Sequence, residues 1–308
     1  MTAQIGVPPT IRQHVQSSLS DTFRSRAVQV FIALWVIAAL VLLAYGHTPW
    51  GGLASLAGIS VFMLITALNT KPNPHVVELD AGERRKVYLQ LVVIAVWIGL
   101  TGLRGMQFHD LIPFNTMIPG WTPLVNTLES FSGRTFGNDN YLTNPVLYFV
   151  IPLILLLLLG AKLPDLGFGR GHRVLRVTLI WCIVPVLAII YLMFNGALLS
   201  WVGQVIFSNS LNNGFFEEFL FRGALQTRLR RLMSPTWALI LQAVIFGVWH
   251  VGLGYSNFGA PGGIITALAS TIAFQAVLGL AFGYIFERSR NLFAPSVFHV
   301  LYNTMFSL

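Results

Sequence analysis

Residues 212–231 read NNGFFEEFLFRGALQTRLRR and place two adjacent glutamates inside an otherwise apolar and aromatic run. A charged side chain at the centre of a membrane helix costs roughly 2.5–3.5 kcal/mol on insertion scales, so two of them need partners or a function. On a helix, Glu218 and Arg222 lie one turn apart with the glutamate first, which is the favoured order for an ion pair. Glu217 points about 100° away from Glu218. We therefore expect Arg222 to neutralise Glu218 and Glu217 to be free to act as a base or a ligand.

The composition is that of an integral membrane protein. Of 308 residues, 55% are hydrophobic and 10% are charged, whereas a soluble domain has about 25% charged residues. The mean hydropathy is +0.70. The net charge of +8 comes from basic residues that cluster at the ends of apolar segments, as topology determinants do, so we expect no nucleic-acid partner. The single cysteine, Cys182, excludes an internal disulfide framework and a cysteine-rich metal site.

The apolar segments predict an all-α fold, a polytopic transmembrane helical bundle of about nine spans with no sheet. Residues 1–26 are expected to form a cytoplasmic N-terminal arm without a cleaved signal peptide. Residues 27–200 are predicted to be N-terminal membrane spans with a long external loop near 104–144, and residues 201–308 a bundle that carries the intramembrane polar residues. The expected spans are 27–46, 53–68, 87–103, 145–161, 177–199, 202–231, 236–254, 264–286 and 292–308.

The positive-inside rule gives one orientation. The N-terminal arm and the basic residues in 71–86, 162–176, 228–231 and 288–290 fall on the cytoplasmic side, and the loops 104–144 and 255–263 and the C-terminus fall outside. We expect a multi-pass integral protein of a bacterial cytoplasmic membrane, in contact with membrane lipid and with its N-terminus in the cytoplasm.

Polar residues of the last spans converge in depth. At 1.5 Å per helical residue, Glu217 lies about 16 Å from the basic end of its helix, His250 about 21 Å into its span and His299 about 10 Å into its span. These depths bracket the middle of a hydrocarbon core about 30 Å thick. His299 and Asn303 share a helix face, as do Phe246 and His250, because each pair is four residues apart.

Such a set of residues is suited to hydrolysis. A carboxylate and a neutral imidazole can hold one water and take its proton as it attacks a carbonyl carbon. A second histidine and an asparagine amide can donate hydrogen bonds to the oxyanion that develops.

Three motifs, in this order on successive hydrophobic helices, resemble those of the CAAX prenyl-protein endopeptidase-like intramembrane protease family, the CAAX proteases and bacteriocin-processing proteins. They are Glu217-Glu218-x-x-x-Arg222, Phe246-x-x-x-His250 and His299-x-x-x-Asn303.

The resemblance implies that residues 201–308 form a catalytic membrane bundle and that the protein is a glutamate-type intramembrane endopeptidase. Glu217 and His250 would activate the water, and His299 and Asn303 would form the oxyanion hole. Glu218, Arg222 and Phe246 would be supporting residues. The substrate would be a hydrophobic or lipid-modified peptide or protein, including prenylated ones, and no cofactor is implied.

Three other functions use the same residues. In a zinc-dependent intramembrane metallohydrolase, Glu217, His250 and His299 would ligate the metal and orient a water. In a non-enzymatic bacteriocin-immunity or membrane scaffold protein, the motif residues would only hold helices together. In a proton-coupled transporter, intramembrane glutamate and histidine would form a proton relay. Chelator sensitivity, peptide cleavage and Glu217-dependent transport distinguish these functions.

Overall fold

The computed structural model describes residues 24–70, 79–113 and 117–308, and every regular element in these ranges is a helix. The predicted all-helical class is confirmed for them. Most of the predicted N-terminal arm and half of the basic loop 71–86 lie outside the described residues.

Each predicted span corresponds to a helical segment. The helices of the first part of the chain are α2 (Arg26–Ala44), α3 (Trp50–Asn69), α4 (Ala81–Phe108), α5 (Trp121–Phe136), α6 (Asn140–Pro145), η1 (Val146–Val150), α7 (Ile151–Leu158), η2 (Leu163–Leu166) and α8 (Val174–Phe194). Those of the second part are α9 (Leu199–Asn209), η3 (Ser210–Gly214), α10 (Phe215–Glu218), η4 (Phe219–Gln226), α11 (Thr227–Leu232), α12 (Pro235–Trp249), α13 (Val251–Phe258), α14 (Ile264–Ser270), η5 (Thr271–Gln275), α15 (Ala276–Ser289) and α16 (Phe293–Ser307).

Fewer helices than the nine predicted are long and apolar enough to cross a membrane. Among the described residues there are six, or up to seven if the bent pair α12 and α13 forms one span. Two predicted spans are helical but fall short of this test. Helix α16 has 15 residues, and the helical run from α9 to α11 carries two glutamates and four arginines.

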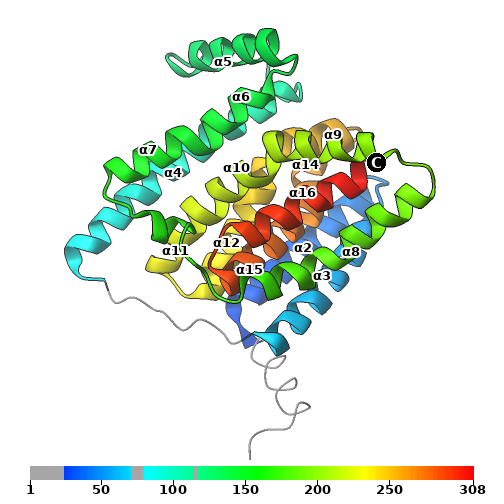
Figure 1. Ribbon diagram of the computed structural model, residues 1–308, viewed down its shortest axis with the longest axis horizontal. Coiled ribbons are helices and arrows are strands. Elements are labelled where there is room, and N and C mark those ends of the chain that lie inside the picture. The colour runs from blue at the N-terminus through cyan, green and yellow to red at the C-terminus, as the bar shows by residue number, and fades with distance from the viewer. Residues whose placement is uncertain (1–23, 71–78, 114–116) are drawn as a thin grey trace, which may run out of the picture.

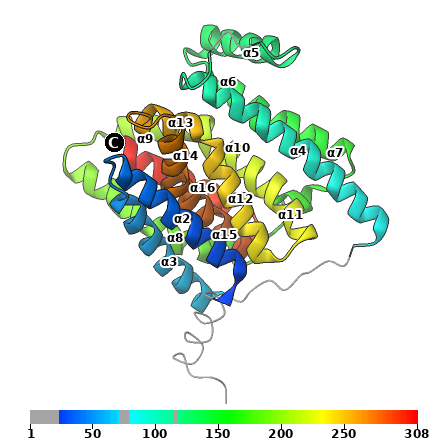
Figure 2. The same cartoon turned by 180° about the vertical axis from the view of Figure 1, so that it is seen from behind.

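Helices α12, α15 and α16 lie at the centre of the molecule (Figure 1). Helices α4, α6 and α7 lie on one side of this centre, and α2, α3 and α8 lie on the other, as Figure 2 shows from behind. Helix α12 packs against α15, and α16 packs against α8. The core between them is rich in buried phenylalanine, and the outward faces of α2 and α8 expose large apolar side chains, as lipid-facing helices do.

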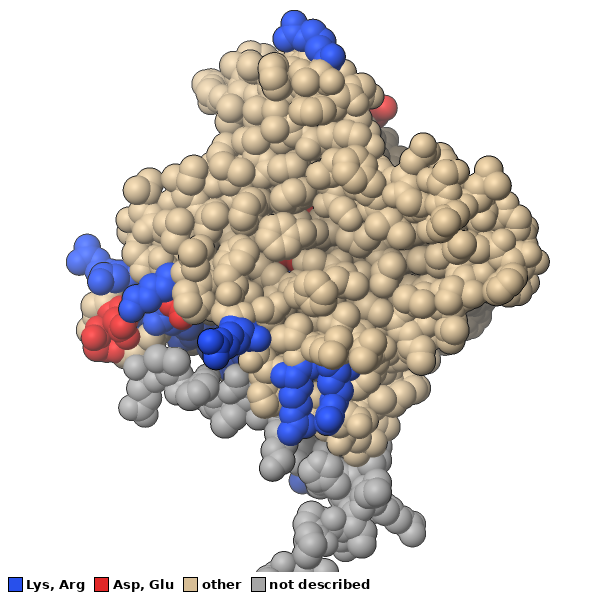
Figure 3. All heavy atoms as spheres, viewed as in Figure 1, with Lys and Arg blue, Asp and Glu red and all other residues tan. Residues whose placement is uncertain are grey.

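Most of the lysine and arginine side chains in view gather at one end of the molecule, and further blue spheres lie at the opposite end (Figure 3). The former is the end at which α4 begins and α11 stops, and a broad, nearly uncharged surface lies above it. The positive-inside prediction assigns this basic end to the cytoplasmic side.

Local signals account for several helix boundaries. The Ser234 side chain accepts a hydrogen bond from the Trp237 backbone N–H and caps α12, as the Ser-Pro pair at residues 234 and 235 would lead one to expect. Two boundaries differ from the prediction. Helix α4 continues to Phe108, so Arg104 is helical instead of opening a loop, and the region 104–144 contains α5 and the start of α6. The predicted span 236–254 is bent by 53° between α12 and α13, at His250.

Candidate active site

Glu217 lies on α10, a short α-helical piece between the π-helical segments η3 and η4. Wider π-helical turns inside a helix are often found at functional sites. Gly214 precedes α10, and a Cβ at this position would overlap the Val300 side chain of α16. The glycine therefore allows α16 to pack closely beside the two glutamates.

Glu217 faces His250 across a gap. Its side chain is buried, and its Oε2 atom has no hydrogen-bond partner among the described residues. Oε2 lies 3.9 Å from His250 Nε2. This separation is too long for a direct hydrogen bond and suits a water that bonds to both atoms.

A backbone contact sets the tautomer of His250. Its Nδ1 atom lies 2.8 Å from the carbonyl oxygen of Phe246. Because a carbonyl oxygen only accepts, Nδ1 must carry a proton, and the neutral ring then presents the Nε2 lone pair toward Glu217. The rings of Phe246 and Trp249 contact the imidazole at centroid distances of 4.5 and 4.8 Å and hold its orientation.

Glu218 is fully buried and has two partners. Its Oε1 atom accepts from Arg222 Nη1 at 3.1 Å and from His299 Nδ1 at 2.8 Å. The predicted ion pair with Arg222 is therefore present, and the contact with His299 adds a link to α16 that the sequence did not predict. Arg222 Nη2 also donates to the Gly279 carbonyl oxygen at 3.1 Å.

Aromatic rings surround the Arg222 guanidinium. Its centre lies 4.5 Å from the Phe246 ring centroid and 5.1 Å from that of Phe282. A cation–π contact that is shielded from water in this way stabilises the folded protein by about 2 kcal/mol. Phe282 also stacks on His299, with centroids 4.4 Å apart and planes 19° apart. Phe246, predicted to be a supporting residue, therefore packs against both Arg222 and His250.

The structure brings the four predicted catalytic residues together around one cavity of about 640 Å³, the larger cavity. They are Glu217, His250, His299 and Asn303. The Asn303 side chain has no hydrogen-bond partner among the described residues. Much of the remaining lining is apolar and comes from Phe246, Phe274, Leu278, Phe282, Tyr302 and Phe306.

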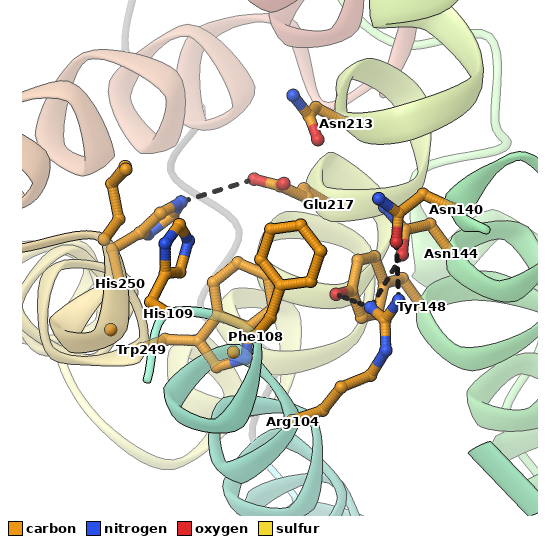
Figure 4. A pocket seen from close by; sticks show the side chains of 13 residues that line it. Arg104, Phe108, His109, Asn140, Asn144, Tyr148, Asn213, Glu217, Trp249 and His250 are labelled. Carbon is orange, nitrogen blue, oxygen red and sulfur yellow. Dashed lines mark hydrogen bonds and ion pairs between the residues drawn. The ribbon is translucent and has the colours of Figure 1, made fainter. Parts of the chain in front are cut away.

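A smaller cavity of about 230 Å³ reaches Glu217 and His250 from the other side. Both cavities are lined by Glu217, His250, Asn213 and Leu253, so they meet at the carboxylate–imidazole pair. Figure 4 shows Glu217 and His250 pointing toward each other, with Arg104, Asn140, Asn144 and Tyr148 on the opposite wall of the smaller cavity.

Arg104 is the buried cation of that opposite wall. Its Nε atom donates to Glu129 Oε1 at 2.8 Å, and its Nη1 atom donates to Asn144 Oδ1 at 2.9 Å and to the Tyr148 hydroxyl at 3.1 Å. A third nitrogen, Nη2, donates to Asn140 Oδ1. Sequence reasoning missed this cluster. The available signals were a lone arginine in an apolar run and two asparagines at helical spacing.

The residues suggested as zinc ligands line one cavity but are not placed to bind a single ion. Within the described ranges, no group of three or more His, Cys, Asp or Glu side chains is placed to hold a metal ion. As placed, these described donors therefore do not fit a three-ligand metal centre.

Residues 199–305 match the family model described as Rce1-like, type II CAAX prenyl endopeptidase Rce1-like. The match contains all three motifs and extends from the start of α9 into α16. It confirms the resemblance inferred from the motifs for this part of the chain. No curated protein and no solved structure matches the chain.

Proposed function

We propose that the protein is an intramembrane endopeptidase that hydrolyses a peptide bond with a water activated by Glu217 and His250. The substrate is a hydrophobic or lipid-modified peptide, with prenylated peptides as the first class to test. The match of residues 199–305 to CAAX-type endopeptidases supports the reaction class, and the apolar lining of the larger cavity supports the substrate class.

The observation that carries the proposal is the pair of acceptors that Glu217 Oε2 and His250 Nε2 present 3.9 Å apart. A water between them donates one hydrogen to each, which leaves an oxygen lone pair directed at the substrate carbonyl carbon. Glu217 takes the proton as the water adds, and then delivers it to the leaving nitrogen. No covalent intermediate with the protein is required.

His299 and Asn303 are the proposed donors to the oxyanion, because both line the larger cavity beside Glu217. The Asn303 amide can donate in any protonation state. His299 Nε2 can donate only when the ring is an imidazolium, since Nδ1 already donates to Glu218. The Glu218 carboxylate, which also pairs with Arg222, would stabilise such an imidazolium through its contact with Nδ1.

The experiment is cleavage of a quenched, prenylated CAAX-type peptide by the purified protein in detergent. We expect Glu217→Gln to lower kcat by at least about 10³-fold, because the amide cannot accept the proton of the water, while the melting temperature stays close to that of the unmodified chain. A strong chelator should leave the rate unchanged, since Glu217, His250 and His299 are not proposed to hold a metal.

Full turnover by Glu217→Gln would remove the proposed base. Loss of activity with chelator and recovery with zinc would instead assign a metallohydrolase. The matched control is Glu83→Gln, which makes the same substitution at an exposed glutamate that lines neither cavity. This control should retain most of the activity.

A further inference from the structure

The smaller cavity is completed by residues that lie outside the matched segment. Arg104 belongs to α4, Asn140 and Asn144 belong to α6, and Tyr148 belongs to η1, whereas the family match begins at residue 199. These helices therefore contribute polar groups to the space beside Glu217.

The Tyr148 hydroxyl is arranged as a hydrogen-bond donor. Its oxygen accepts from Arg104 Nη1 at 3.1 Å, and no described residue accepts its proton. The ring is buried and contacts Trp249 edge-on at a centroid distance of 5.3 Å. The ring is fixed, and its oxygen already accepts a hydrogen bond from the Arg104 guanidinium. The hydroxyl proton can therefore be donated only to a group in the cavity.

The guanidinium that holds this hydroxyl is itself fixed. Glu129, Asn140 and Asn144 accept from three sides of Arg104. Asn144 Nδ2 in turn donates to the Asn212 carbonyl oxygen at 2.6 Å, in the π-helical segment that leads to Glu217. A cation beside the phenol oxygen withdraws electron density and makes the O–H a stronger donor. The network therefore connects the position of Tyr148 to that of the helix that carries Glu217.

We propose that Tyr148 is a further catalytic residue, which donates a hydrogen bond to the nitrogen of the scissile peptide bond, and that Arg104 is its positioning residue. This inference rests on the proposed peptidase function. The two cavities meet at Glu217 and His250. A peptide bond at this junction that directs its carbonyl oxygen to His299 and Asn303 places its nitrogen toward the smaller cavity.

The chemistry makes this hydrogen bond specific to the reaction. The nitrogen of a planar amide has no available lone pair, because that pair is delocalised into the carbonyl group. When the water oxygen adds, the carbonyl carbon becomes tetrahedral, the nitrogen becomes pyramidal and its lone pair can accept from Tyr148. The nitrogen then exchanges this hydrogen bond for the proton that Glu217 removed from the water, so its lone pair is protonated, the C–N bond breaks and Tyr148 keeps its own proton. A hydrogen bond from Tyr148 that forms only after the water has attacked stabilises the transition state and not the bound substrate. It therefore raises kcat without strengthening substrate binding.

The experiment compares Tyr148→Phe with the unmodified chain on two substrates that share one acyl segment, a peptide and its 4-nitrophenyl ester. We expect kcat on the peptide to fall about 100-fold with KM unchanged, which is the lower end of the effect of removing one transition-state donor. On the ester, whose nitrophenolate departs without assistance, the rate should stay within about twofold, since no nitrogen has to accept a bond.

The ratio of peptide to ester turnover decides the result, because it does not depend on the fraction of protein that folds. An unchanged ratio, with either no loss or equal loss on both substrates, would overturn the assignment of Tyr148. Arg104→Lys should lower the ratio in the same direction, because a lysine has no planar fork with which to hold two asparagines and the hydroxyl together. An unchanged ratio in this variant would overturn the role of Arg104.

The matched control is Tyr284→Phe. The Tyr284 hydroxyl donates to the Met63 carbonyl oxygen at 3.0 Å and lines neither cavity, so its removal should leave the ratio unchanged. Failure of the proposed function is recognised separately, since the unmodified chain would then cleave neither the peptide nor the ester in a Glu217-dependent manner. That result would also remove the inference about Tyr148.

Discussion

Glu218 and Arg222 show how two buried charges can be kept inside an apolar bundle. Both side chains are 0% exposed, and Glu218 Oε1 accepts from Arg222 and from His299. Arg222 is further surrounded by the rings of Phe246 and Phe282. Glu218 is thereby neutralised, and Glu217, one residue earlier, is left to face the cavity.

Arg222→Ala should destabilise the protein by about 3–5 kcal/mol, because it leaves Glu218 as a buried charge with one partner fewer. Thermal unfolding in detergent, followed by tryptophan fluorescence, measures this loss. The matched control is Arg176→Ala, whose guanidinium donates to the Asn69 carbonyl oxygen at the exposed surface and should change stability by less than about 0.5 kcal/mol. Equal melting temperatures for the two variants would mean that the ion pair contributes no stability.

At the scale of single residues, spacing along the chain predicted contacts within one helix. The shared depth and the motif resemblance predicted that Glu217 and His250 meet, but other contacts between helices were missed. The Glu218–Arg222 pair and the Ser234 cap follow from spacings of three and four residues, and both are present. The bond from His299 to Glu218 joins residues separated by 81 positions. Arg104 and Tyr148 lie far from Glu217 in the chain, and no local pattern indicates that they share a cavity with it.

At the scale of elements, the break between α12 and α13 positions the imidazole. His250 follows the last residue of α12 and precedes the first residue of α13, and the two helices meet at 53°. The sequence predicted one span here because the run 236–254 is mostly apolar and has no internal proline. The bend lies where α13 packs against α4, and such packing between helices leaves no local signature.

Gly252 is the point at which α13 meets α4. A Cβ at this position would overlap the Gly105 carbonyl oxygen, which is backbone and cannot rotate away. Gly252→Ala should therefore push α13 from α4, lower stability by about 1–3 kcal/mol and reduce peptidase activity, since the smaller cavity lies between these helices. Thermal unfolding and the peptide assay measure the two effects.

The matched control for this contact is Gly99→Ala, on α4 itself. No atom lies within 4 Å of a Cβ built at Gly99, and alanine is the better helix former, so stability should stay equal or rise slightly. If Gly252→Ala behaved in the same way, the close approach of α4 and α13 would have no role in shaping the site.

At the scale of the whole molecule, the cavities lie in the half that is remote from the basic end. Helix α4 carries Arg84 and Arg85 near its first residue. Near its other end it contributes Arg104 to the smaller cavity. Helix α16 begins after Arg290 and contributes His299 and Asn303 further along. If the basic end is cytoplasmic, as the positive-inside rule predicts, a polar substrate segment enters from the opposite side.

Cysteine labelling tests this orientation. In a Cys182→Ser background, Asn257→Cys places a thiol on an exposed residue that lines the larger cavity, and Arg176→Cys places one near the basic end. A membrane-impermeant maleimide added to intact cells should label the first and spare the second. The reverse pattern would invert the predicted topology and place the entrance on the cytoplasmic side.

The two cavities that meet at Glu217 and His250 also have a consequence for the end of a catalytic cycle. In the proposed reaction, the new amine would lie toward the smaller cavity and the new acid toward the larger one, so the two fragments would leave from different cavities. Rejoining them would require both fragments to return and occupy the site together. The shape of the protein would thus govern how the fragments leave, whereas the direction of hydrolysis is set by the excess of water.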